Sequence, residues 1–257
     1  MKFNLKGKRP NLVILSDIHI GADGHSHLEF QETLKWCREN NSYIALAGDL
    51  IDLGIATPGD KSSFDKILGN AMEPTEQVLE AMDVFEPFAR KGRIVASVGG
   101  NHEARLQRAA MVNLPKLIAH HLQVPDCLGA IACQFHWGKD HSALGVISHG
   151  RSGATGNIWR ELRTKLLGLY PEADFVTAGH THHLEHQVDH SLSMDEDGSD
   201  YWRETHLIRS GNYMNRSGSK YSQEANYTPL PQGSPIIYFE KDGTLSVDVE
   251  TLQYRRI

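Results

Sequence analysis

Long apolar runs are absent from this sequence of 257 residues, and so is any excess of basic residues. No stretch approaches the roughly 20 apolar residues that a membrane span needs. The opening MKFNLKGKRP also lacks the apolar region of a signal peptide. We therefore expect a cytoplasmic protein without a membrane partner. The formal net charge of −6 does not indicate nucleic acid as a partner, although a local basic groove could be hidden in that sum.

Cysteine is scarce, whereas histidine is abundant. The three cysteines, Cys37, Cys127 and Cys133, form no CxxC pair and cannot all pair within one chain, which fits a reducing compartment. The 15 histidines direct attention to metal or proton chemistry instead.

Apolar, β-branched runs alternate with amphipathic stretches in the first half of the chain. This order implies a largely parallel sheet with helices on its faces. The spacing predicts a capping box at Ser26 and Glu29. The expected elements are strands at 11–17, 42–49 and 93–100 and helices at 26–40, near 62–69 and at 73–92. The last of these helices has its expected core-facing stripe at Val78, Leu79, Met82 and Phe85.

The second half begins with two more apolar strands, at 143–150 and 173–180, separated by an expected helix at 157–168. From residue 184 onward the pattern predicts antiparallel strands joined by turns such as DEDGSD and KDG. One α/β domain over residues 1–257 with two sheets is the simplest account.

Each of the five apolar strands ends in a polar cluster, in chain order SDIHIG, AGDLID, GGNHEAR, SHG and GHTHH. Because the carboxyl ends of parallel strands share one edge of a sheet, we expect these clusters to converge. Their mixed oxygen and nitrogen donors suit borderline divalent ions better than calcium or magnesium. The donors are too many for one tetrahedral zinc site but fit two adjacent ions.

The ordered series D-x-H, G-D-x-x-D, G-N-H-E, H and G-H-x-H resembles the calcineurin-like metallophosphoesterase superfamily, in particular a branch found in phages and bacteria. The match covers about residues 11 to 183. The resemblance implies a four-layer α-β-β-α sandwich with two mixed sheets and a metal site at the strand C-terminal ends. It also implies two divalent ions, with manganese first and iron, zinc, cobalt or nickel as alternatives. By the same resemblance, the ions would be held by Asp17, His19 and His182 on one side and by Asn101, His149 and His180 on the other, with Asp49 bridging them.

The resemblance further implies that His102 faces the scissile phosphate of a phosphate-ester substrate without binding metal. Asp52 would then accept a hydrogen bond from His102 and keep it protonated. Arg105 and Arg151 follow ligand motifs and are candidates for binding the substrate phosphate through a guanidinium fork, the alternative being ordinary surface arginines. The remaining histidines of the GHTHH stretch and beyond, including His186, are expected to be solvated.

Phosphodiesters, cyclic nucleotides or nucleic-acid ends are the favoured substrates. Leu53 stands where protein serine/threonine phosphatases carry an arginine, and Asp52 stands where purple acid phosphatases place a metal-binding tyrosine. The alternatives are a phosphomonoesterase acting on nucleotides or phosphoproteins and a non-catalytic, metal-bound recognition subunit.

Overall fold

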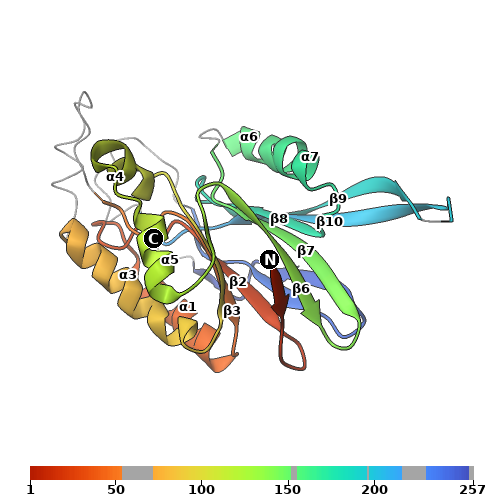
Figure 1. Cartoon of the computed structure of the whole chain (residues 1–257), viewed down its shortest axis with the longest axis horizontal. Coiled ribbons are helices and arrows are strands. Elements are labelled where there is room, and N and C mark those ends of the chain that lie inside the picture. The colour runs from red at the N-terminus through yellow and green to blue at the C-terminus, as the bar shows by residue number, and fades with distance from the viewer. Residues whose placement is uncertain (54–71, 152–154, 196, 216–229, 255–257) are drawn as a thin grey trace.

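Two six-stranded sheets pack against each other, and helices cover the outer faces of the pair (Figure 1). The computed structural model describes residues 1–53, 72–151, 155–195, 197–215 and 230–254. The expected four-layer α-β-β-α sandwich with two mixed sheets is thus confirmed. The helical piece expected near 62–69 lies outside the described residues.

The first sheet is mostly parallel and is buried on both faces. In spatial order its strands are β13 (Leu245–Asp248), β12 (Ile236–Phe239), β2 (Asn11–Leu15), β3 (Tyr43–Ala47), β4 (Ile94–Val98) and β5 (Asp126–Cys127). Strands β2 to β5 run parallel, whereas β12 and β13 are antiparallel additions. In β2, Val13 faces the core under the helices and Ile14 faces the core between the sheets. Burial on both faces explains why these strands are continuous apolar runs.

The second sheet is mixed. In spatial order its strands are β1 (Lys2–Asn4), β6 (Ala130–Trp137), β7 (His141–Ser148), β8 (Phe175–Ala178), β10 (Asp200–Ser210) and β9 (Leu184–Met194). Strands β9 and β10 form a long antiparallel hairpin that extends beyond the neighbouring strands (Figure 1). The antiparallel strands expected after residue 184 are therefore confirmed. Two short strands, β11 (Gln232–Gly233) and β14 (Gln253–Tyr254), pair separately.

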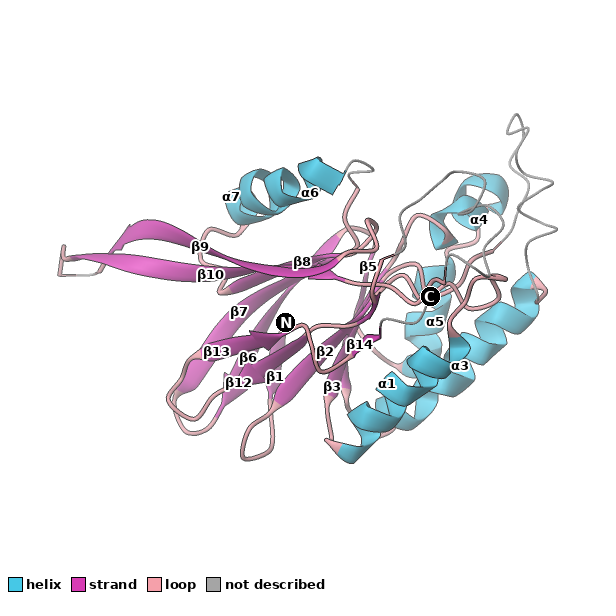
Figure 2. Cartoon of the chain, turned by 180° about the vertical axis from the view of Figure 1, so that it is seen from behind, coloured by secondary structure: helices cyan, strands magenta, loops and turns pink. Residues whose placement is uncertain are grey.

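The helices form the two outer layers (Figure 2). The first sheet is covered by α1 (His27–Glu39), α3 (Pro74–Ala89) and α5 (Leu114–Leu122), and α4 (Glu103–Ala110) precedes α5. The second sheet is covered by α6 (Thr155–Arg160), the π-helical segment η1 (Glu161–Leu166) and α7 (Leu167–Leu169). The π-helical turn was not expected within 157–168. No helix among the described residues is long and apolar enough to cross a membrane.

Two local predictions are wrong. Ser26 precedes α1, but its side chain makes no capping hydrogen bond because its backbone, at φ −83° and ψ 73°, is not extended. A capping box forms instead at the start of α3, between Glu73 and Glu76. Leu79 is 55% exposed. It lies six residues before Phe85 and hence about 120° away around the helix axis, so it misses the buried stripe.

Candidate metal centre

The five polar clusters meet at one place, although their strands belong to different sheets. Strands β2, β3 and β4 are in the first sheet, whereas β7 and β8 are in the second. The idea of a single shared sheet edge is therefore too simple. The stacked sheets present their carboxyl ends together, so that residues from both sheets come within contact distance, as His149 does with Asp49.

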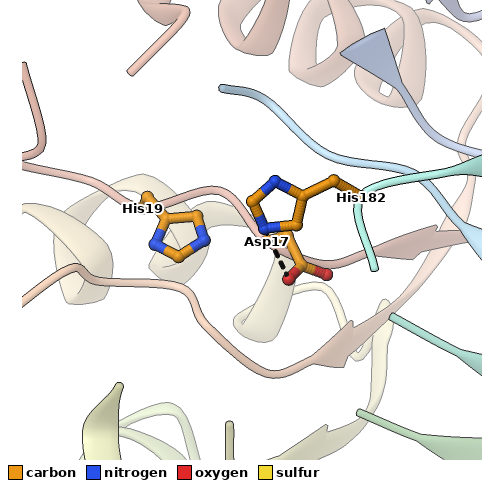
Figure 3. Close-up of side chains that lie close together, drawn as sticks. All are labelled: Asp17, His19 and His182. Carbon is orange, nitrogen blue, oxygen red and sulfur yellow. Dashed lines mark ion pairs between the residues drawn. The ribbon is translucent and has the colours of Figure 1, made fainter. Parts of the chain in front are cut away.

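Asp17, His19 and His182 form the first group of candidate ligands, with their ligand atoms within 4.8 Å of one another (Figure 3). The Asp17 carboxylate is fully buried, and its Oδ1 lies 3.3 Å from Nε2 of His182. It also accepts hydrogen bonds from the hydroxyl of Ser16 and from the backbone N–H of His180 at 2.9 and 3.1 Å. These bonds fix the carboxylate between β2 and the loop after β8.

His19 has the arrangement that a metal ligand needs. Its Nδ1 lies 3.1 Å from Oδ1 of Asp52, an acceptor, so this nitrogen carries the proton. Its Nε2 is buried and has no hydrogen-bond partner among the described residues. A buried polar atom without a partner is costly. A metal ion at Nε2, with the carboxylate orienting the ring from the other side, would satisfy it.

Asp49, His149 and His180 form the second group, again with ligand atoms within 4.8 Å. Nδ1 of His149 lies 2.9 Å from the carbonyl of Ala47, so this nitrogen donates. Its Nε2 faces Oδ1 of Asn101 at 3.0 Å and Oδ2 of Asp49 at 3.2 Å. Burial disfavours the charged ring, but the carboxylates of Asp49 and Asp17 outweigh it and raise the pKa of His149 to about 10, so without a metal ion Nε2 is protonated and donates to these oxygens. A metal ion at Nε2 would displace this proton. Electron-pair donors that converge in this way suit a cation. The residues present therefore fit two metal ions.

His102 lies beside both groups, and its ligand atom is within 4.8 Å of those of His19 and Asp49. Its Nδ1 is 2.9 Å from Oδ1 of Asp52, and its backbone N–H donates to Oδ1 of Asp49 at 2.8 Å. The Arg105 guanidinium lies along the imidazole, with Nη2 2.9 Å from Nε2. The structure thus brings His102, Asp52 and Arg105 together at the edge of the candidate centre.

The surroundings shift the pKa values of the two histidines that share Asp52 in opposite directions. Burial lowers the pKa of His19, and the nearby His102 lowers it further. Burial also disfavours the charged form of His102, but the carboxylates of Asp49 and Asp52 outweigh it and raise the pKa of His102. Burial therefore favours neutral His19, the form that a metal ligand needs, whereas the two carboxylates favour the protonated form of His102 against the opposing effect of Arg105.

The backbone is strained at five candidate ligands. Non-glycine residues seldom adopt a positive φ. Each such residue costs roughly 1–3 kcal/mol and keeps this conformation only where its surroundings impose it. Strain of this kind clusters at functional sites. The five are Asp17 (φ 51°), His19 (53°), Asp49 (49°), His180 (67°) and His182 (59°).

Glu103 holds the backbone of two loops that carry candidate ligands, a role that the sequence did not predict. Its buried carboxylate accepts from the backbone N–H groups of Leu50 at 2.6 Å, Gly100 at 3.0 Å and Asp49 at 3.2 Å. It thus ties the loop after β3 to the loop after β4. The available signal was an acidic residue at the start of a helix, directly after Asn101 and His102.

Other residues fall outside the cluster. Arg151 is exposed, and its side chain makes no hydrogen bond or ion pair with another described residue. Nδ1 of His183 lies 3.5 Å from Oε1 of Glu185. His186 is not simply solvated, as was expected, because its Nε2 lies 2.9 Å from Nδ1 of His206 on the neighbouring strand.

The sequence matches the model of the calcineurin-like phosphoesterase family over residues 10–184. The chain belongs to this family. The matched region contains every candidate ligand and ends where β9 begins. Calcineurin-like phosphoesterases as a family hydrolyse phosphoesters and depend on metal ions.

Three solved structures that resemble this calcineurin-like phosphoesterase do so distantly. A predicted phosphoesterase from Streptococcus pneumoniae TIGR4 is 12% identical, with a TM-score of 0.40 over 93% of this chain and 88% of that chain. YfkN, a calcineurin-like phosphoesterase from Bacillus subtilis, is 10% identical, with a TM-score of 0.42 over 94% and 88%. Vps29 complexed with zinc, from Entamoeba histolytica, is 12% identical, with a TM-score of 0.33 over 93% and 97%. No curated protein matches the chain.

Proposed function

We propose that this chain is a phosphodiesterase with two divalent metal ions, acting on cyclic nucleotides or on phosphodiesters of nucleic acid. The supporting observation is the pair of ligand groups around Asp49, beside His102, whose pKa the carboxylates of Asp49 and Asp52 raise in spite of its burial. Asp17, His19 and His182 would hold one ion. The other ion would be held by Asn101, His149 and His180, with Asp49 bridging to the first. When bound, such ions would activate water and neutralise charge on the phosphoryl oxygens.

The protein's own part in the reaction centres on His102. With Nδ1 bound to Asp52, Nε2 is the nitrogen that would donate a proton to the departing oxygen of the ester once Arg105 has moved away from it. Arg105 lies against Nε2 and would move onto the phosphoryl oxygens of a bound substrate. Arg151, on the loop after β7, is a second candidate for the same contact. The diester preference is supported by Leu53, which stands where protein serine/threonine phosphatases, which act on monoesters, carry an arginine.

Hydrolysis of paired substrates tests the proposal. Metal-stripped enzyme is reloaded with Mn²⁺, Fe²⁺, Zn²⁺, Co²⁺ or Ni²⁺ and assayed on bis-(p-nitrophenyl) phosphate, p-nitrophenyl phosphate, a cyclic nucleotide and DNA ends. We expect turnover only after reloading, and faster turnover of diesters. Equal rates on mono- and diesters would contradict the diester preference, and no hydrolysis of any substrate would contradict the proposed activity.

Replacement of His102 separates catalysis from metal binding. His102→Ala is expected to lower kcat by about 10²–10⁴-fold while Mn²⁺ still binds, because the ligand groups on either side of Asp49 remain. His121→Ala, at an exposed histidine of α5, is the matched control and should leave kcat unchanged. Loss of Mn²⁺ from His102→Ala would mean that His102 is itself a ligand.

A further inference from the structure

A buried arginine lies next to the turn that bears two candidate ligands. Arg209 lies near the end of β10, where its backbone is in register with Ala178 of the parallel strand β8. Ala178 precedes His180 by two residues. Arg209 is only 3% exposed. Its Nε is buried without a hydrogen-bond partner in the described part of the chain. A buried cation with an unsatisfied donor is costly and calls for an explanation.

The Arg209 guanidinium joins the turn to the strand that follows it. Its Nη2 donates to Oγ1 of Thr181 at 2.9 Å, and its Nη1 donates to Oε2 of Glu185 at 2.7 Å. Its Cζ lies 5.5 Å from the ring centre of Trp159 in α6. Thr181 lies between His180 and His182 in the chain, so Arg209 contacts the residue that adjoins both candidate ligands.

This turn needs external support. His180 and His182 both have positive φ, and the N–H of Thr181 donates to the carbonyl of Gly179 at 2.8 Å in a tight turn. A strained conformation persists only when its surroundings impose it. Through its hydrogen bond to the Thr181 hydroxyl, Arg209 of β10 can fix this turn to the sheet.

We infer that Arg209 is a positioning residue, which fixes the His180–His182 turn through Thr181 and Glu185 and so sets the geometry of both metal ligands. The inference rests on the proposed function, because it takes both histidines as ligands. Residues that orient metal ligands typically contribute 10–100-fold to metal affinity. Arg209 would act in this way through the backbone of the turn.

The chain offers a matched control arginine. Arg163 in η1 also bridges to β9, through Asp189 at 3.0 Å and Gln187 at 3.1 Å. Its side chain is 41% exposed, and its partners lie beyond the turn. Arg209→Met and Arg163→Met therefore each remove a guanidinium that bridges to β9, one buried and one partly exposed, and only the first of them contacts the turn.

The first readout is Mn²⁺ affinity, measured by calorimetry on metal-stripped protein. We expect Arg209→Met and Thr181→Val each to weaken binding by about 10-fold or more, and the double variant to lose no more than the stronger single variant. Arg163→Met and Thr181→Ser, which keeps the hydroxyl acceptor, should bind like wild type. Wild-type affinity in both Arg209→Met and Thr181→Val would overturn the inference.

The second readout needs no metal. Amide hydrogen exchange of residues 179–183 in the stripped protein should be faster in Arg209→Met and Thr181→Val than in wild type and in the two controls. If Arg209→Met does not fold, Thr181→Val and Thr181→Ser provide the same comparison. Wild-type protein that binds no Mn²⁺ would contradict the proposed function, whereas unchanged exchange would contradict the role of Arg209.

Discussion

Replacement of Glu103 by alanine should destabilise the protein more than most buried substitutions. The carboxylate satisfies the backbone N–H groups of Asp49, Leu50 and Gly100. Alanine would leave these three buried donors without a partner, together with the N–H of Ile51, whose bond to Oε1 is longer at 3.4 Å. A buried donor left unsatisfied costs roughly 1–3 kcal/mol, so that even the low end of this range gives about 3 kcal/mol for the three together.

Glu103→Gln provides a graded comparison. The amide has nearly the same volume and keeps one acceptor oxygen, but its NH₂ group would face a backbone donor. We expect this variant to lose about 1–3 kcal/mol, which corresponds to the loss of one hydrogen bond. Glu161→Ala is the matched control, since Glu161 is also buried but accepts from only one backbone N–H among the described residues, that of Arg151 at 3.3 Å.

Thermal and guanidinium unfolding of metal-stripped protein measure these effects. For a chain of this size, 1 kcal/mol shifts Tm by about 2–4 °C, so Glu103→Ala should lower Tm by about 6–12 °C. Glu161→Ala should lower it by a few degrees at most. A Glu103→Ala variant whose free energy of unfolding lies within about 1 kcal/mol of wild type would refute the reasoning, because the carboxylate would then not be holding the two loops.

Two further predictions concern packing and pH. In Gly100→Ala the new Cβ would lie 2.1 Å from Oδ1 of Asp49, so calorimetry should find weakened Mn²⁺ binding, whereas Gly129→Ala, with nothing within 4 Å, should match wild type. Burial and the neighbouring His206 lower the pKa of His186 to about 4, so the unfolded chain takes up its proton first, near pH 6.5. Stability should fall as pH drops from about 6.5 towards 4. Urea unfolding should show a shallower fall for His186→Gln, and an equal fall in both proteins would contradict this.

The strands that precede the site could be predicted because their burial is simple. Strands such as β2 and β3 are buried on both faces, so an uninterrupted apolar run followed by a polar cluster marks each of them and its end. The candidate ligands follow directly from those ends. Local pattern therefore located Asp17 and Asp49 without knowledge of the tertiary structure.

The supporting contacts could not be predicted because they join distant parts of the chain. Glu103 bonds to a backbone N–H 53 residues earlier, and Arg209 reaches Thr181 from 28 residues later. Such contacts depend on which strands are neighbours, and the local pattern does not specify this. Leu79 was misplaced for a related reason, since its exposure depends on which helix face packs against the sheet.

The number of Mn²⁺ ions bound per chain tests the central claim most directly. Equilibrium dialysis of metal-stripped wild type at saturating Mn²⁺, followed by elemental analysis, gives this number, with Asp49→Asn as the comparison. The account predicts two ions per wild-type chain and weakened binding of both in Asp49→Asn, because this carboxylate would bridge them. A wild-type chain that binds one ion or none would contradict the account.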